Sequence, residues 1–259
     1  MSKKDSYTVK RIRILEKRLA ARNKKVISKI FIDFSKKIAI DNSQKYLKIS
    51  IEMDYEWLKN KFRTAFEGIY LYTFRETSKL FQEFYKIPKA KAIKGIADYF
   101  LKDWNKKNAA LQAKNVTETT RKILNRIITE GQEAGIAYDE MVTRLMNEVE
   151  EMSEQRATTI ARTETIKSIN TTSFETAKAS GANEKCWKHR SKGKHSRLHH
   201  EMLAEKWVDI NHKWILKNGV EADYPHQAGL PASEVVRCNC LVIFRWRNKN
   251  EEVKKEEKN

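Results

Sequence analysis

Histidine and cysteine are confined to the last third of this 259-residue chain. All six histidines and all three cysteines follow residue 185, so any imidazole or thiol chemistry must lie there. One residue separates Cys238 from Cys240, and on a β-strand their thiols would share one face, about 6.5–7 Å apart. Two thiolates at that separation suit a single metal ion if the backbone bends.

A zinc ion at these thiolates would need two further ligands, and four histidines are candidates. They are His195, His199, His200 and His226. We name His200, Cys238 and Cys240 as the metal-binding residues of a structural zinc site. The C-x-C spacing differs from the usual C-x₂-C of zinc sites, so a second interpretation stays open. In that interpretation the two cysteines are buried free thiols that pack as small apolar side chains.

Arg197 precedes His200 by three residues, which places both side chains on one face if the segment is helical. Such a pair could hold a phosphate or orient a metal ligand. The alternative is structural: His200 is satisfied by a backbone carbonyl, and Arg197 pairs with Glu164 or Glu201.

The net charge of +18 is the second feature that bears on function. A field of this sign attracts DNA, RNA, an anionic membrane face or an acidic protein surface. A lysine-rich, solvated surface is the alternative interpretation. Two basic segments, one near the N-terminus and one after residue 187, are candidates for phosphate contact. The residues assigned to nucleic-acid binding are Lys10, Arg11, Arg18, Lys188, Arg190, Lys192 and Lys194.

The first two thirds of the chain must position this site, and their sparse glycine and proline favour long helices. Apolar spacing predicts the helices, and the aromatic residues of 52–86 are expected in a core. Asn115 and Ser153 resemble helix-capping residues and are expected to begin new helices. The predicted helices span 8–40, 52–86, 89–113, 115–131, 139–150 and 153–181.

The amino-acid pattern changes after Gly181, where β-branched and alternating segments predict strands at 206–210 and 235–244. The fold class is therefore α+β: a long helical N-terminal two thirds, then a small irregular α+β lobe with short strands at the C-terminus. No apolar run approaches the ~20 residues of a membrane span, so no membrane contact is expected. The predicted divisions are a helical basic docking region (1–114), a domain with the chemical motifs (115–247) and a charged flexible tail (248–259).

Five short motifs give residues 117–246 a resemblance to the phage Mu protein F-like, or phage head-morphogenesis, family of minor capsid proteins. Their order along the chain is that of the family. Four expected features differ: the stretch before Arg197 lacks an acidic residue, and Asn239 replaces the arginine of C-R-C. Ala204-Glu205 also replaces the usual Asp/Asn-Gly, and the acidic residue after the proline turn is replaced around His226-Gln227. The residues that carry the motifs are Arg162, Thr163, Glu164, Trp187, Arg197, His200, Pro225, Cys238 and Cys240.

The resemblance implies a minor capsid or head-morphogenesis protein of a tailed phage or prophage, without catalytic activity. Its implied partners are the portal protein inside the procapsid, coat and scaffold proteins, and double-stranded DNA bound non-specifically during assembly, packaging or ejection. The implied location is the interior of the virion head, and the host cytoplasm during assembly. The basic N-terminal helix would dock such a protein through its apolar face.

Two enzymatic alternatives stand beside this interpretation. A metal-dependent nuclease would use the C-terminal His/Cys cluster, with Glu201, Asp209 and Asp223 as the nearby carboxylates, although these form no recognisable motif. The second enzymatic alternative is an ADP-ribosyltransferase or other toxin fused to a head domain. The sequence shows no phosphate-binding glycine loop, no Ser-His-Asp order and no nucleotide fingerprint to support it.

Overall fold

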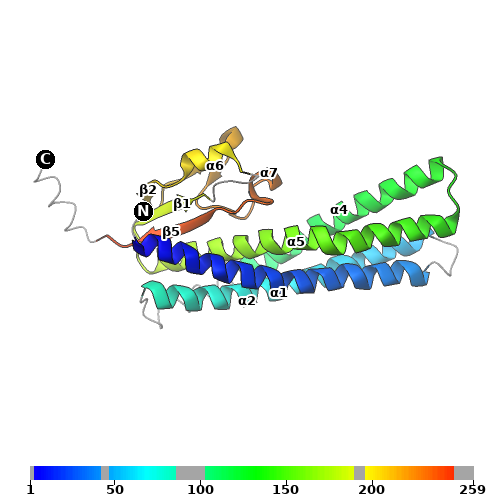
Figure 1. Ribbon diagram of the computed structural model, residues 1–259, viewed down its shortest axis with the longest axis horizontal. Helices are drawn as coiled ribbons and strands as arrows, with labels where there is room; N and C mark the ends of the chain where they lie inside the picture. Colours follow the sequence, from blue (N-terminus) through cyan, green and yellow to red (C-terminus); the bar gives the residue numbers. More distant parts are fainter. Residues whose placement is uncertain (1–2, 42–46, 86–102, 190–195, 248–259) are drawn as a thin grey trace, which may run out of the picture. The chain divides into compact units, whose positions relative to one another are not determined.

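The computed structural model describes residues 3–41, 47–85, 103–189 and 196–247, and long helices precede a lobe of short strands (Figure 1). The helices are α1 (Lys3–Asp41), α2 (Leu47–Tyr85), α4 (Asn105–Glu133), α5 (Tyr138–Ala179), α6 (Leu198–Leu203), the 3₁₀ helix η3 (Lys217–Gly219) and α7 (Ala232–Val235). The strands are β1 (Glu184–Lys188), β2 (Trp207–Asp209), β3 (Trp214–Ile215), β4 (Glu221–Ala222) and β5 (Leu241–Arg245). The predicted α+β class is confirmed.

Two predicted helix starts are wrong, because Asn115 lies inside α4 and Ser153 lies inside α5. The hydroxyls near both positions bind the helix itself. Thr119 donates to the Asn115 carbonyl oxygen at 2.8 Å, and Ser153 donates to the Glu150 carbonyl oxygen at 2.7 Å. Such hydrogen bonds to the preceding turn let serine and threonine sit within a helix instead of capping its start.

The chain folds into two compact units, and α1, α2 and α5 contribute residues to both. The first unit comprises Met1–Arg18, Thr73–Tyr99 and Thr163–Asn259, and the second comprises Leu19–Tyr72 and Phe100–Arg162. The predicted divisions at residues 114 and 247 stay predictions. The expected tail at 248–259 and most of the expected helix at 89–113 lie outside the described residues.

The second unit has the aromatic core that the spacing of residues 52–86 predicts. Phe62, Phe66 and Tyr70 are fully buried on α2, and each ring stacks on the next with centroids 5.9 and 6.1 Å apart. Phe31 of α1 meets Phe62 edge-on, with the ring centroids 5.2 Å apart. Trp104, next to the start of α4, meets Tyr70 in the same geometry. Such offset and edge-on pairs add to the stability that burial alone supplies.

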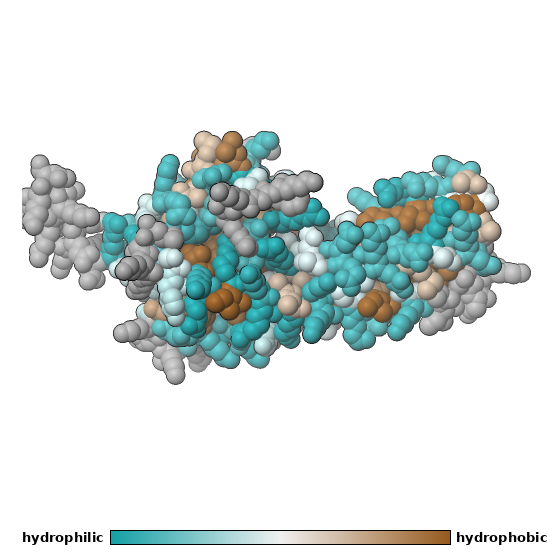
Figure 2. Space-filling view, in the orientation of Figure 1, coloured by the Kyte–Doolittle hydropathy of each residue, from teal (hydrophilic) through white to brown (hydrophobic). Residues whose placement is uncertain are grey.

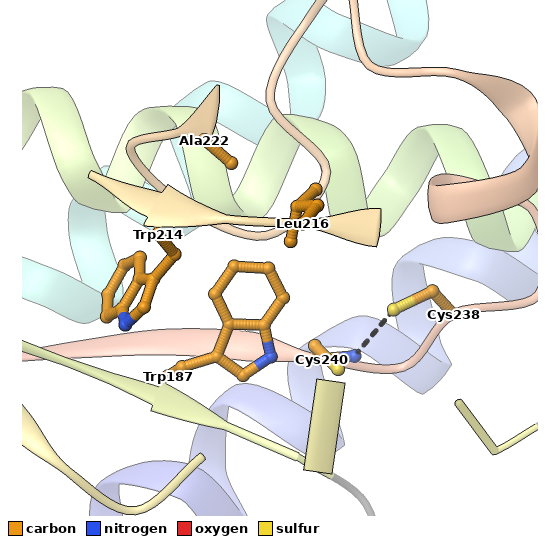
Figure 3. Packing of buried hydrophobic residues seen from close by; sticks show 6 residues of the cluster. All are labelled: Trp187, Trp214, Leu216, Ala222, Cys238 and Cys240. Atoms are coloured by element: carbon orange, nitrogen blue, oxygen red, sulfur yellow. Dashed lines mark hydrogen bonds between the residues drawn. The ribbon is translucent and has the colours of Figure 1, made fainter. Parts of the chain in front are cut away.

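The first unit contains a three-stranded antiparallel sheet in the order β2–β1–β5. Phe244 of β5 packs against Phe81 of α2 and Phe174 of α5, with ring centroids 6.2 and 6.4 Å away. The lobe that holds the sheet has its own core, in which the Trp187 indole lies between Trp214 and the two cysteines (Figure 3). This core comprises Trp187, Trp214, Leu216, Ala222, Cys238 and Cys240.

The C-terminal half of α5 is buried on every side from Thr163 to Phe174, although most of its side chains are polar. Asn170 explains part of this arrangement. Its amide donates to the backbone oxygens of Pro225 and Cys240, both at 3.0 Å, and its own oxygen accepts from Val242 N–H at 3.3 Å. One side chain therefore fixes two loops and the start of β5, and these segments carry the candidate metal ligands.

None of the described helices combines the length and apolarity that a membrane crossing requires. Figure 2 shows mostly hydrophilic residues on the face in view, with separate hydrophobic patches between them. This surface agrees with the high proportion of charged residues, which is 33% of the chain.

Candidate functional site

His200, Cys238 and Cys240 converge in the lobe, as the metal-site prediction requires. The Nδ1 atom of His200 lies 3.5 Å from Cys238 Sγ and 3.7 Å from Cys240 Sγ. The three ligand atoms all lie within 4.8 Å of one another. The exposed fractions of the three residues are only 2%, 4% and 1%, so the group is closed to solvent.

The expected placement of both cysteines on a strand is wrong, because α7 ends at Val235 and β5 begins at Leu241. The chain turns between them, and Arg237 takes a φ of 60°, in the left-handed region that non-glycine residues rarely adopt. The turn brings the Cys240 N–H within 3.4 Å of Cys238 Sγ (Figure 3). This bend supplies the close approach of two thiols that an extended strand would prevent.

Glu234 at the end of α7 orients the imidazole of His200. Its Oε2 atom lies 2.8 Å from Nε2 of both His199 and His200. A neutral ring that donates through Nε2 has its lone pair on Nδ1, and Nδ1 of His200 faces the two sulfurs. Burial acts to raise the pKa of Glu234, but the hydrogen bonds from both histidines outweigh it and hold this pKa below its ordinary value. Glu234 is therefore ionised at neutral pH.

The thiols of Cys238 and Cys240 have pKa values that are shifted in opposite directions. A hydrogen bond with the Cys240 thiol lowers the pKa of Cys238 well below its ordinary value, and the nearby His226 and His200 lower it further against the effect of burial. The same hydrogen bond, with burial, raises the pKa of Cys240. The direction of these shifts makes Cys238 the more acidic thiol of the pair, and a thiolate is the form of cysteine that binds metal.

Two further histidines border the group. His226 has an exposed fraction of 2% and a φ of 63°, and a hydrogen bond with its ring is one of the effects that lower the pKa of Cys238. His189 is partly buried, with Nδ1 3.4 Å from Cys240 Sγ and Nε2 2.9 Å from Ser196 Oγ. The structure thus brings one of the other three candidate histidines of the sequence, His226, beside the thiols, while His195 lies outside the described residues.

The expected partners of Arg197 and His200 are wrong. Arg197 donates to two backbone oxygens, those of Ser233 at 2.6 Å and Val236 at 2.9 Å, so it holds α7 instead of pairing with a carboxylate. His200 is satisfied by the Glu234 carboxylate and not by a backbone carbonyl. The sequence gives no signal for Glu234, because it lies 34 residues from His200 and only the fold brings them together.

The other motif residues lie on α5, on β1 and in the loop after β4. Glu164 is buried and binds the Lys167 ammonium at 2.9 Å, and Thr163 beside it is also buried. Arg162, half-buried, belongs to the second unit. Trp187 packs edge-on against the His200 ring, with centroids 5.2 Å apart. Pro225 presents the carbonyl oxygen that Asn170 binds.

Several residues assigned to nucleic-acid binding have acidic partners within the protein. Arg11 binds Glu83 at 3.4 Å, Arg18 binds Glu76 at 2.7 Å, and the buried Lys188 binds Glu205. Lys10 is exposed. Arg190, Lys192 and Lys194 lie outside the described residues. DNA contact by this set stays a prediction.

Lys185 is a buried cation on β1 at the base of the lobe. Its ammonium donates to the Asp223 carbonyl oxygen at 2.7 Å and lies 4.8 and 5.1 Å from the ring centroids of Trp214 and Phe174. Burial lowers the pKa of this lysine to about 8, against the attraction of the Asp223 carboxylate. The folded protein therefore releases this proton more readily than the unfolded chain does.

Deprotonation of Lys185 is expected to add to the free energy of unfolding between pH 8 and 10.5, the lowered and ordinary pKa of this lysine, because the unfolded chain then keeps a proton that the folded protein has lost. The raised pKa of Cys186 acts in the opposite direction in part of this range, so the effect is the difference between variants. Lys185→Met should remove this contribution, whereas the exposed Lys206→Met should keep it. Urea unfolding across this pH range measures the effect. Parallel curves for the unmodified protein and Lys185→Met would contradict it.

Half of this chain is similar to part of a known enzyme. Over 129 residues, 49% of the chain, it is 36% identical to the NAD(+)–arginine ADP-ribosyltransferase EFV of Enterococcus faecalis strain V583. The matched stretch is 26% of that protein, so the chain spans about a quarter of the length of this relative. No protein-family model matches the chain, and no solved structure does.

This similarity contradicts the expected membership in the phage Mu protein F-like, head-morphogenesis family. The role as a minor capsid protein and the nuclease alternative are both wrong, and so is the expectation of a protein without catalysis, because the relative is named as a transferase. The five motifs comprise few residues each, and so few cannot separate one family from another. Portal, coat and scaffold partners and a virion location stay predictions.

Proposed function

We propose that this chain takes part in the ADP-ribosylation of arginine side chains, with NAD⁺ as the donor. The observation that carries the proposal is the 36% identity with an arginine ADP-ribosyltransferase over 129 residues. Because related folds host different activities, this chain must also contain side chains that suit the reaction.

Transfer of ADP-ribose to arginine requires that one bond breaks, one bond forms and one proton is removed. The bond between the ribose C1 carbon and the nicotinamide nitrogen breaks, and nicotinamide leaves as a neutral molecule. A nitrogen of the arginine side chain bonds to the same carbon and gives up one proton, because the guanidinium is protonated at ordinary pH. A base within reach of that proton assists the transfer.

His199 and Glu234 form the pair that suits this demand. Nε2 of His199 lies 2.8 Å from Glu234 Oε2, and the His199 side chain is 31% exposed. An imidazole that donates through Nε2 can accept a proton at Nδ1, and the ionised carboxylate stabilises the imidazolium that results. We therefore assign His199 as the base and Glu234 as its positioning residue.

The test is transfer of label from NAD⁺, labelled in its ADP-ribose part, to an arginine-rich peptide. We expect the full chain to modify the peptide, and His199→Ala to slow the transfer by about 10²–10⁴-fold, the usual contribution of a general base. His212→Ala, an exposed histidine in the same lobe, is the matched control and should keep the rate. No transfer above a heat-denatured sample would overturn the proposal, and equal rates in both variants would overturn the assignment of His199.

A further inference from the structure

The geometry around the two thiols matches that of a tetrahedral zinc site. With Zn–S bonds of about 2.3 Å and Zn–N bonds of about 2.0 Å, tetrahedral angles place a ligating sulfur and nitrogen about 3.5 Å apart. His200 Nδ1 lies 3.5 and 3.7 Å from the sulfurs of Cys238 and Cys240. Three ligand atoms therefore already have nearly the separations that they would have around one ion.

The surroundings of His200 also suit metal binding. A metal-binding histidine usually donates its other ring N–H to a carboxylate, which fixes the tautomer and the direction of the ring. Glu234 accepts this hydrogen bond from Nε2 at 2.8 Å and leaves Nδ1 turned toward the thiols.

His226 is the candidate for a fourth nitrogen donor. Its ring is buried, and its hydrogen bonding with Cys238 is one cause of the lowered pKa of that thiol. It lies outside the group of three ligand atoms that are within 4.8 Å of one another, so its ring would move toward them when an ion binds. Its backbone holds a strained φ of 63°, and strain of this kind persists where the surrounding structure enforces it.

His189 is the competing donor, and two features favour His226. His189 is only partly buried, so a bond to it would leave the site open to solvent, whereas His226 is buried. The loop that carries His226 is also tied to the cysteine segment by a single side chain, since Asn170 binds the backbone oxygens of Pro225 and Cys240. This link holds the two segments at a fixed separation before any metal binds.

We propose that Cys238, Cys240, His200 and His226 bind one zinc ion in a closed tetrahedral site that stabilises the lobe. Two thiolates and two imidazoles in tetrahedral geometry select zinc over harder cations such as magnesium or calcium. The site has four protein ligands and therefore a structural role. It does not depend on the proposed transferase activity.

The test is titration of the full chain with zinc chloride against a chromophoric chelator, after removal of bound metal under reducing conditions. We expect one zinc per chain, about 100-fold or more weaker binding in Cys238→Ser, and about 10-fold or more weaker binding in His226→Ala. Cys186→Ser removes a buried thiol outside the group and is the matched control for the cysteines. His189→Ala is the control for the fourth ligand, and both controls should bind as the unmodified chain does.

Cobalt(II) loaded on the unmodified chain gives a second measurement that needs no variant. We expect the absorption of thiolate-to-cobalt charge transfer and of a tetrahedral ion. Stoichiometric zinc binding that is lost in His189→Ala and kept in His226→Ala would overturn the assignment of the fourth ligand. Absence of zinc binding, or equal affinity in Cys238→Ser and the unmodified chain, would show that the cysteines only pack as apolar side chains.

Discussion

Asn170→Ala is expected to lower the free energy of unfolding by about 3 kcal/mol or more, because each buried polar group left without a partner costs about 1–3 kcal/mol. Three such groups lose their partner in this variant: the carbonyl oxygens of Pro225 and Cys240 and the N–H of Val242. Urea unfolding with linear extrapolation measures the change.

Ser168→Ala is the matched control for Asn170→Ala. Ser168 lies two residues earlier on α5 and is fully buried, but its hydroxyl has no hydrogen-bond partner among the described residues. Removing that hydroxyl should leave stability unchanged or slightly raise it. If the two variants unfold at the same urea concentration, Asn170 does not hold the lobe in the way that its hydrogen bonds indicate.

Glu234→Gln is expected to weaken zinc binding by about 10- to 100-fold, the usual effect of removing the carboxylate partner of a metal-binding histidine. The glutamine amide presents N–H groups where the carboxylate accepts from His199 and His200, so it disfavours the His200 tautomer with a free Nδ1. Zinc titration measures the affinity, and the apoprotein's unfolding curve separates this effect from a loss of fold.

The control for Glu234→Gln is Glu201→Gln, which changes an exposed carboxylate on α6 next to His200. Its zinc affinity should equal that of the unmodified chain. A normal affinity in Glu234→Gln would mean that His200 presents Nδ1 to the thiols without this carboxylate, and the positioning role of Glu234 would be wrong.

The helices could be predicted from the sequence because their apolar residues recur at helical spacing. Phe62, Phe66 and Tyr70 follow this rule and form the expected core. The helix boundaries could not be predicted equally well. Ser153 resembles a cap, and only its hydrogen bond to the Glu150 carbonyl oxygen reveals that the helix continues.

The candidate site was predictable in its ligand types but not in its geometry. Confinement of histidine and cysteine to the last third of the chain indicated His200, Cys238 and Cys240. Their approach depends on the positive φ of Arg237, which replaces the expected strand by a turn. The contribution of Glu234 depends on a contact between α6 and α7, and no local spacing in the sequence encodes it.

The most direct test of the metal centre is X-ray absorption at the zinc edge on the zinc-loaded, unmodified chain. The proposed site predicts two sulfur neighbours at about 2.3 Å and two nitrogen neighbours at about 2.0 Å, with the outer-shell scattering of imidazole. A shell of only oxygen and nitrogen, or of six neighbours, would place the zinc elsewhere and contradict the site formed by Cys238, Cys240, His200 and His226.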